Sequence, residues 1–220
     1  MREERVNKLK IILSISAFWI IFIADVLVHI TNMFGEQYWR ELSRIRTPAL
    51  YFATFVFVLF PLTKPVIMKM YDTIKPYGKY TSGIIYAMTI FLVSSLCPYL
   101  HISYSYYSIT SGYLYNNITT DTGILTDILN GFDYFKNPVG LLYMALSCVI
   151  FILLFIVIIS GKTKFPRWFA FINPLVSILL KLALSVFSQE IADLLWPLLI
   201  PAFGIAVFFT GVAFLTWNGD

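Results

Sequence analysis

The chain has 220 residues, of which 59% are hydrophobic and only 13% are charged, and its formal net charge is +4. Soluble domains carry roughly 25% charged residues, so this composition excludes an ordinary soluble domain and indicates an integral membrane protein. The positive charge does not indicate a nucleic-acid-binding protein, because the Lys and Arg residues are spread over short segments and do not form one patch.

Six apolar segments reach the ~20 residues that a helix needs to cross a bilayer. In chain order they are predicted at about 11–30, 49–68, 82–104, 139–160, 169–187 and 194–217. No long polar stretch is left that could house a second domain. The predicted fold is therefore an all-α integral membrane protein, a six-transmembrane-helix bundle that forms a single domain over residues 1–220.

The distribution of Lys and Arg predicts the orientation, since cytoplasmic loops carry an excess of both. With the N-terminus in the cytoplasm, ten basic residues fall on the cytoplasmic side and four on the outer side. The ten are Arg2, Arg5, Lys8, Lys10, Lys69, Lys75, Lys79, Lys162, Lys164 and Arg167, and the four are Arg40, Arg44, Arg46 and Lys136. We therefore expect a multi-pass protein of a bacterial cytoplasmic membrane with both termini inside.

The two longer outer loops are predicted to hold short helices that lie on the membrane surface. In the connection from Ser105 to Asn137, four apolar residues recur at helical spacing, namely Ile124, Leu125, Ile128 and Leu129. The loop over 31–47 is expected to form a similar helix around Tyr38, Trp39 and Leu42.

Ionisable residues inside the predicted helices are the main indication of function, because each costs at least ~2.5–3.5 kcal/mol on insertion scales. Four of them fall at a similar depth in the outer half of the bundle, on the first, third and fifth predicted helices. Aromatic and acidic residues near them complete a candidate set for ligand binding or proton relay. The set is Asp25, His29, His101, Lys181, Tyr104, Glu190 and Trp196.

Two interpretations of this set remain open. In the structural one, Asp25 pairs with Lys181, and the histidines hydrogen-bond to backbone or tyrosine groups and hold the helices together. In the functional one, the set lines a polar pocket that binds or moves a small molecule or a lipid. Among possible functions, the binding or movement of a small molecule or a lipid leads. Its alternatives are an intramembrane enzyme that uses Asp25 and His101 as an acid–base pair on a lipid, and an accessory or scaffold protein without a ligand.

Proline and asparagine residues within the apolar segments are expected to shape the helices by freeing backbone carbonyls. They are Asn173, Pro174, Pro98, Pro197 and Pro201. The chain has only two histidines, and no metal site or cofactor is predicted. The expected partners are membrane lipids and a possible small-molecule or lipid ligand, with no nucleic acid, and nothing in the sequence sets the oligomeric state.

Several short motifs resemble a bacterial family of multi-pass membrane proteins known only as a domain of unknown function. They are Ile23-Ala24-Asp25-Val26-Leu27, Trp39-Arg40-Glu41-Leu42-Ser43, Arg46-Thr47-Pro48, Tyr99-Leu100-His101, Phe165-Pro166-Arg167-Trp168 and Asn173-Pro174-Leu175. The resemblance spans most of the chain. The resemblance implies no activity, but it implies that Asp25, His101, Asn173 and Pro174 are features that members of the family share.

Overall fold

The fold is all helical over the residues that the structure, a computed structural model, describes: 2–33, 56–116, 122–188, 191, 195 and 201–217. No strand occurs among these residues, so the predicted all-α class is confirmed. The elements are α1 (Arg2–Met33), η1 (Val56–Leu59), α3 (Phe60–Ile74), η2 (Lys75–Tyr77), α4 (Lys79–Asn116), α5 (Thr122–Ile159), η3 (Arg167–Ile172), α6 (Pro174–Phe187) and α9 (Pro201–Thr216).

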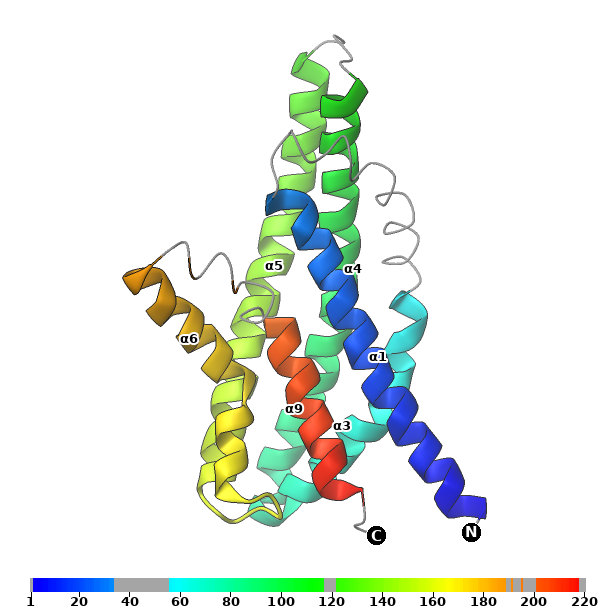
Figure 1. The fold of residues 1–220 in the computed structure, drawn as a ribbon, viewed down its shortest axis with the longest axis vertical. Helices are drawn as coiled ribbons and strands as arrows, with labels where there is room; N and C mark the ends of the chain where they lie inside the picture. Colours follow the sequence, from blue (N-terminus) through cyan, green and yellow to red (C-terminus); the bar gives the residue numbers. More distant parts are fainter. Residues whose placement is uncertain are drawn as a thin grey trace.

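Successive α-helices run in alternating directions (Figure 1). α1 begins and α9 ends at the same end of the molecule, where η2 and the connection 160–166 also lie. We call this the basal end. α1 packs against α3 and α9, and α4 packs against α3 and α5. α9 also contacts α3 and α6, so it lies among helices from both halves of the chain.

A buried hydroxyl joins α1 to the backbone of α3. Ser14 is fully buried, and its Oγ donates a hydrogen bond to the carbonyl of Thr63 at 3.0 Å and accepts one from the backbone N–H of Val66 at 3.3 Å. Pro65 lies between these two positions, inside the helix, where it cannot donate a backbone hydrogen bond. Ser14 therefore supports α3 at the turn that proline weakens.

Two glycines let neighbouring elements approach the backbone of α9. A Cβ at Gly204 would lie 2.8 Å from Cα of Pro174, and a Cβ at Gly211 would lie 2.5 Å from the ring of Phe169. Both distances are too short for any larger residue without movement of a neighbour. Small residues at helix contacts are typical of membrane helices, whose association depends on close packing.

Aromatic side chains fill the space around α9. Phe209 stacks on Phe18 of α1 with ring centroids 4.3 Å apart, and Phe208 stacks on Phe169 of η3 at 5.2 Å. The indole N–H of Trp19 also donates a hydrogen bond to the hydroxyl of Thr210 at 3.0 Å. α9 is thus held between α1 on one side and η3 on another.

The predicted long loop from Ser105 to Asn137 is wrong. α4 continues to Asn116 and α5 starts at Thr122, so most of this region is helix. The apolar residues at 124–129 do have helical spacing, but they lie in the first turns of α5 and not in a separate surface helix. α5 also continues through Pro138, so this proline lies inside the helix and not at the start of the helix predicted at about 139–160. The predicted surface helix around Tyr38 lies outside the described residues.

The predicted fifth helix, 169–187, is wrong in its first part. Residues Arg167–Ile172 form the 3₁₀ helix η3, and α6 begins only at Pro174. Asn173 is the N-cap of α6, and its side chain accepts a hydrogen bond from the backbone N–H of Leu175 at 2.9 Å. Asn at the N-cap followed by Pro at the first position is a strong helix start. The pair therefore begins a helix and does not kink one.

The remaining boundaries differ at their ends. α1 extends past the predicted 11–30 in both directions, and the described part of the second segment continues from 56 to Ile74. The sixth predicted helix, 194–217, is described as α9 from Pro201 onward, and Pro201 is the first residue of that helix.

Two helices within the described part of the chain are long and apolar enough to cross a membrane, Val6–Val26 in α1 and Asn130–Ile159 in α5. α6 and α9 are also apolar but are shorter, with 14 and 16 residues. The other predicted crossings do not meet this test over the described residues.

Candidate functional site

Asp25 is buried in the upper part of α1, where it is only 6% exposed. Its neighbour Ala24 is fully buried, and Val26 packs with Phe22 against Ala202 in the first turn of α9. α1 is one of the helices long enough to cross a membrane. The carboxyl group therefore lies inside the helical bundle, at the level where α9 begins, in a segment that is otherwise apolar.

A small cavity lies next to this level, one helical turn closer to the basal end. Residues of α1, α4, α5 and α9 line it, among them Ile21, Leu96, Tyr143 and Ala202. Its volume of about 10 Å³ is the space that one water molecule needs. Below Asp25 the described side chains are thus closely packed, and no larger ligand fits there.

The pairing of Asp25 with Lys181, on which the structural interpretation depends, does not occur in the structure. Lys181 is exposed on α6, and no ion pair joins these two described side chains. α6 is held close to α9 at its start, where Pro174 meets Gly204, and it leans outward from there (Figure 1). At its far end Val186 and Phe187 are 83% and 87% exposed. The direction of α6 therefore keeps Lys181 away from the centre of the bundle.

The structure places the other predicted site residues only in part. His29 lies in α1, and Pro98, His101 and Tyr104 lie in α4, but their side chains are outside what the structure describes. Glu190, Trp196 and Pro197 fall outside the described residues altogether. Of the seven predicted ligand-binding candidates, Asp25 is thus the one whose side chain is described and buried.

Comparison with known protein families gives a match over nearly the whole chain. The model of a family described as a family of unknown function, DUF6796, matches residues 1–218. The chain belongs to this family. Its resemblance to a domain of unknown function is therefore confirmed. Neither the curated proteins nor the solved structures give a match.

Sequence reasoning missed a second polar site of this DUF6796 chain, at the basal end. A pocket of about 390 Å³ lies between the end of α3, the connection 160–166 and the end of α9. Its polar lining includes Lys69, Asp72, Lys75 and Lys164. These lysines had been interpreted only as indicators of topology. The sequence does contain a signal for this pocket. The lysines occur at or near two separate connections, and helices that alternate in direction bring both connections to the same end of the molecule.

Proposed function

We propose that this DUF6796 protein is a multi-pass membrane protein that binds or moves a small molecule or a lipid at the level of Asp25. The observation that carries the proposal is the burial of this carboxyl group in a helix long enough to cross a bilayer. An acidic group in that setting is costly, and such groups in membrane proteins usually serve ligand, ion or proton pathways.

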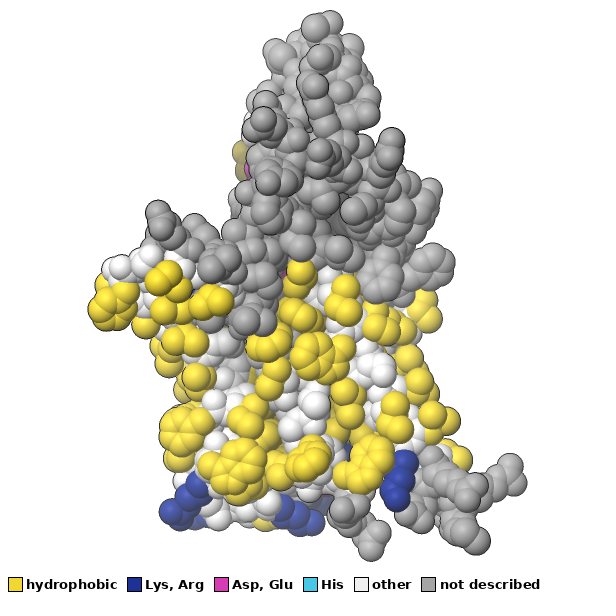
Figure 2. All heavy atoms as spheres, viewed as in Figure 1, with side chains coloured by type: hydrophobic (Ala, Val, Ile, Leu, Met, Phe, Trp, Pro, Cys, Tyr) yellow, Lys and Arg dark blue, Asp and Glu magenta, His cyan; other side chains and the backbone are white. Residues whose placement is uncertain are grey.

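The membrane setting is supported by the apolar outer surface of the molecule. In each of the two long apolar helices only 39% of the most apolar window is buried, which is unlike the core helix of a soluble protein. Large exposed side chains include Leu141 and Met144 of α5 and Leu179 of α6. Figure 2 shows hydrophobic side chains over the middle of the visible face, with Lys and Arg at the basal end. Apolar surface of this extent is suited to lipid contact.

Six crossings with both termini in the cytoplasm fit the course of the chain. The helices alternate in direction, and both ends of the chain lie at the basal end (Figure 1). The connections at that end carry Lys75, Lys79, Lys162, Lys164 and Arg167. By the positive-inside rule, we assign the basal end to the cytoplasmic side of a bacterial cytoplasmic membrane. Asp25 then lies in the outer half of the bilayer.

The fifth crossing requires more than α6 alone. A helix of 14 residues spans about 21 Å at 1.5 Å per residue, which is less than the ~30 Å of a hydrocarbon core. The apolar η3 segment, which directly precedes Asn173, would add to the length of this crossing.

The ligand site that we propose lies above the closely packed level of Ile21, around Asp25. His29 is one turn beyond Asp25 along α1, and His101 and Tyr104 belong to α4, which contacts α1. These are the residues that could share a ligand or a proton with the carboxyl group. Lys181 no longer belongs to this group, because it is exposed on α6.

The test compares molecules retained by the purified full chain. Native mass spectrometry in a mild detergent should detect a bound lipid or small molecule in the wild type and its loss in Asp25→Asn. Lys181→Met, which changes an exposed charge at a similar predicted depth, should retain it. Size-exclusion profiles and melting curves establish that both variants are folded. Identical retention by folded Asp25→Asn, or no retention by the wild type, would contradict the proposal.

A further inference from the structure

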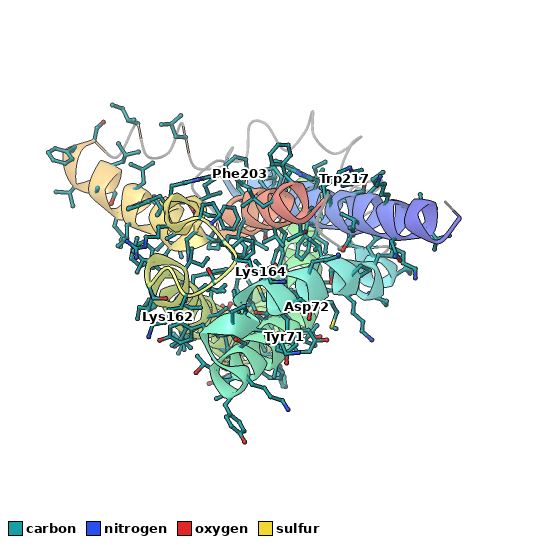
Figure 3. The ribbon with its side chains drawn as sticks, turned by 90° about the horizontal axis from the view of Figure 1, so that it is seen from below. Tyr71, Asp72, Lys162, Lys164, Phe203 and Trp217 are labelled. Carbon is teal, nitrogen blue, oxygen red and sulfur yellow. The ribbon has the colours of Figure 1, made fainter. Side chains whose placement is uncertain are left out.

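The basal-end pocket combines positive charge with an apolar wall. Lys69 and Lys75 come from the end of α3 and from η2, and Lys164 comes from the connection between α5 and η3. Phe165 and Leu215 form apolar parts of its lining. Figure 3 looks onto this end and shows Lys164 and Asp72 near its centre, whereas Lys162 lies toward the edge.

The pocket is held in shape by a backbone contact. The N–H of Lys164 donates a hydrogen bond to the carbonyl of Thr73 at 3.0 Å, so the connection is fixed to the end of α3. Beside it, the ammonium group of Lys75 lies 5.9 Å from the centre of the Tyr71 ring, a cation–π contact that orders this lysine at the rim. These two contacts thus fix the backbone at Lys164 and the side chain of Lys75.

The charges of the lining favour an anion. Three lysines face one carboxylate, that of Asp72. The C-terminal ends of α3 and α9 also border the pocket, and each contributes a partial negative charge of roughly half an elementary charge. Even so, ammonium groups outnumber acidic side chains in the lining by three to one.

The size of the pocket favours a ligand larger than a simple inorganic ion. Its volume of about 390 Å³ is within the range of small-ligand pockets, roughly 300–1,000 Å³, and far above the roughly 10–15 Å³ that one water molecule needs. The lining includes the apolar residues Phe165 and Leu215, and Phe214, one residue before Leu215 in α9, is 80% exposed. An anionic group with an apolar tail matches this combination.

We propose that the basal-end pocket binds the phosphate group of an anionic membrane phospholipid. The lysines would hold the headgroup, and the acyl chains would lie along the apolar surface that begins at Phe214. Basic pockets between helices on the cytoplasmic side are suited to such headgroups. The inference uses the membrane placement proposed above but is independent of Asp25, which lies in the upper part of α1.

The experiment measures lipid binding to the purified full chain in detergent by native mass spectrometry. The probes are dioleoyl phosphatidylglycerol, dioleoylglycerol, which lacks the phosphate headgroup, and glycerol 3-phosphate, which lacks the acyl chains. We expect phosphatidylglycerol to bind at least 10-fold more tightly than either of the others. Lys164→Gln should weaken its binding about 3- to 10-fold, in the range of a partly exposed charge-assisted hydrogen bond. Asp72→Asn should strengthen it about 2-fold.

Lys162→Gln is the matched control, because Lys162 is an exposed lysine two positions away that does not line the pocket. Its affinity for phosphatidylglycerol should stay within 2-fold of the wild type. Equal losses in Lys162→Gln and Lys164→Gln would mean diffuse surface charge and overturn the proposal. Equal binding of dioleoylglycerol would overturn the phosphate site, and equal binding of glycerol 3-phosphate would overturn the lipid as its ligand. Asp25→Asn should bind phosphatidylglycerol like the wild type, so this proposal and the one at Asp25 can fail separately.

Discussion

The side-chain amide of Asn173 donates a hydrogen bond to the backbone carbonyl of Phe151, in the C-terminal part of α5, at 2.8 Å. The same side chain caps α6 through the N–H of Leu175, and it is only 2% exposed. One asparagine therefore sets both where α6 begins and how the segment before it is attached to α5.

Replacing Asn173 should destabilise the fold in two steps. Asn173→Ser keeps an oxygen that can cap α6 but cannot reach Phe151, whereas Asn173→Ala removes both bonds. We expect Asn173→Ala to lower the free energy of unfolding by about 2 kcal/mol, with roughly 1 kcal/mol from each bond, and Asn173→Ser to lie between it and the wild type. Melting curves of the purified variants measure this order. A wild-type melting temperature for Asn173→Ala would contradict the dual role.

A methyl group at position 211 should disturb the packing of η3 on α9. In Gly211→Ala the new Cβ would lie 2.5 Å from the ring of Phe169, and overpacking of this kind costs about 1–3 kcal/mol. The matched control is Gly83→Ala in α4, where a Cβ meets nothing within 4 Å. It should be neutral or stabilising by up to about 1 kcal/mol.

The clash at Gly211 also predicts a rescue. Phe169→Leu shortens the side chain that the new Cβ would meet, so the double variant should be more stable than the sum of the two single losses implies. Thermal unfolding of the four proteins provides this double-mutant cycle. Strict additivity would show that Gly211 matters for its backbone and not for its contact with Phe169.

Removing the hydroxyl of Ser14 should loosen the contact between α1 and α3. Ser14→Ala loses the hydrogen bonds with Thr63 and Val66, and we expect a loss of about 1–2 kcal/mol of stability. Ser16→Ala, on the exposed side of the same helix, should have little effect. Equal melting temperatures for the two variants would exclude a stabilising role for Ser14.

The proposed placement in a membrane predicts three different labelling patterns for single cysteines. In a background without Cys97 and Cys148, a membrane-impermeant thiol reagent should label Lys162→Cys only from the cytoplasmic side and Asn130→Cys only from outside. Met144 is 59% exposed in the protein alone. A cysteine in its place should nevertheless react from neither side, because lipid would cover it. Labelling of Met144→Cys as fast as Lys162→Cys would contradict a membrane-spanning α5.

Hydropathy predicts where the helices of this protein lie far better than where they end. Windows of apolar residues locate α4 and α5 at about 82–104 and 139–160, but α4 continues to Asn116 and α5 already begins at Thr122. The break before Pro174 is missed for the opposite reason, because η3 is as apolar as a helix and only the capping role of Asn173 separates the two. Helix identity thus follows from composition, whereas boundaries depend on local hydrogen bonds.

For the candidate site, the sequence predicts how deep each residue lies along its helix, but not which residues are in contact. Counting residues from the end of a helix places Asp25 and Lys181 at similar heights, but it does not show which way each side chain faces or how far apart the helices lie. Those depend on contacts such as Gly204 against Pro174, which direct α6 outward. The basal-end pocket escaped prediction because its lysines come from two separate connections, and only the fold brings them together.

The hydrogen bond between Trp19 and Thr210 joins residues 191 positions apart. At a translation rate of about 5–20 residues per second, α9 is made roughly 10 to 40 s after the helix on which it packs. During that interval the face of α1 that includes Phe18 and Trp19 lacks the neighbour that covers it in the complete fold. The assembly of this protein is therefore completed only when α9 arrives, and a chain that stops before Pro201 leaves this aromatic face uncovered.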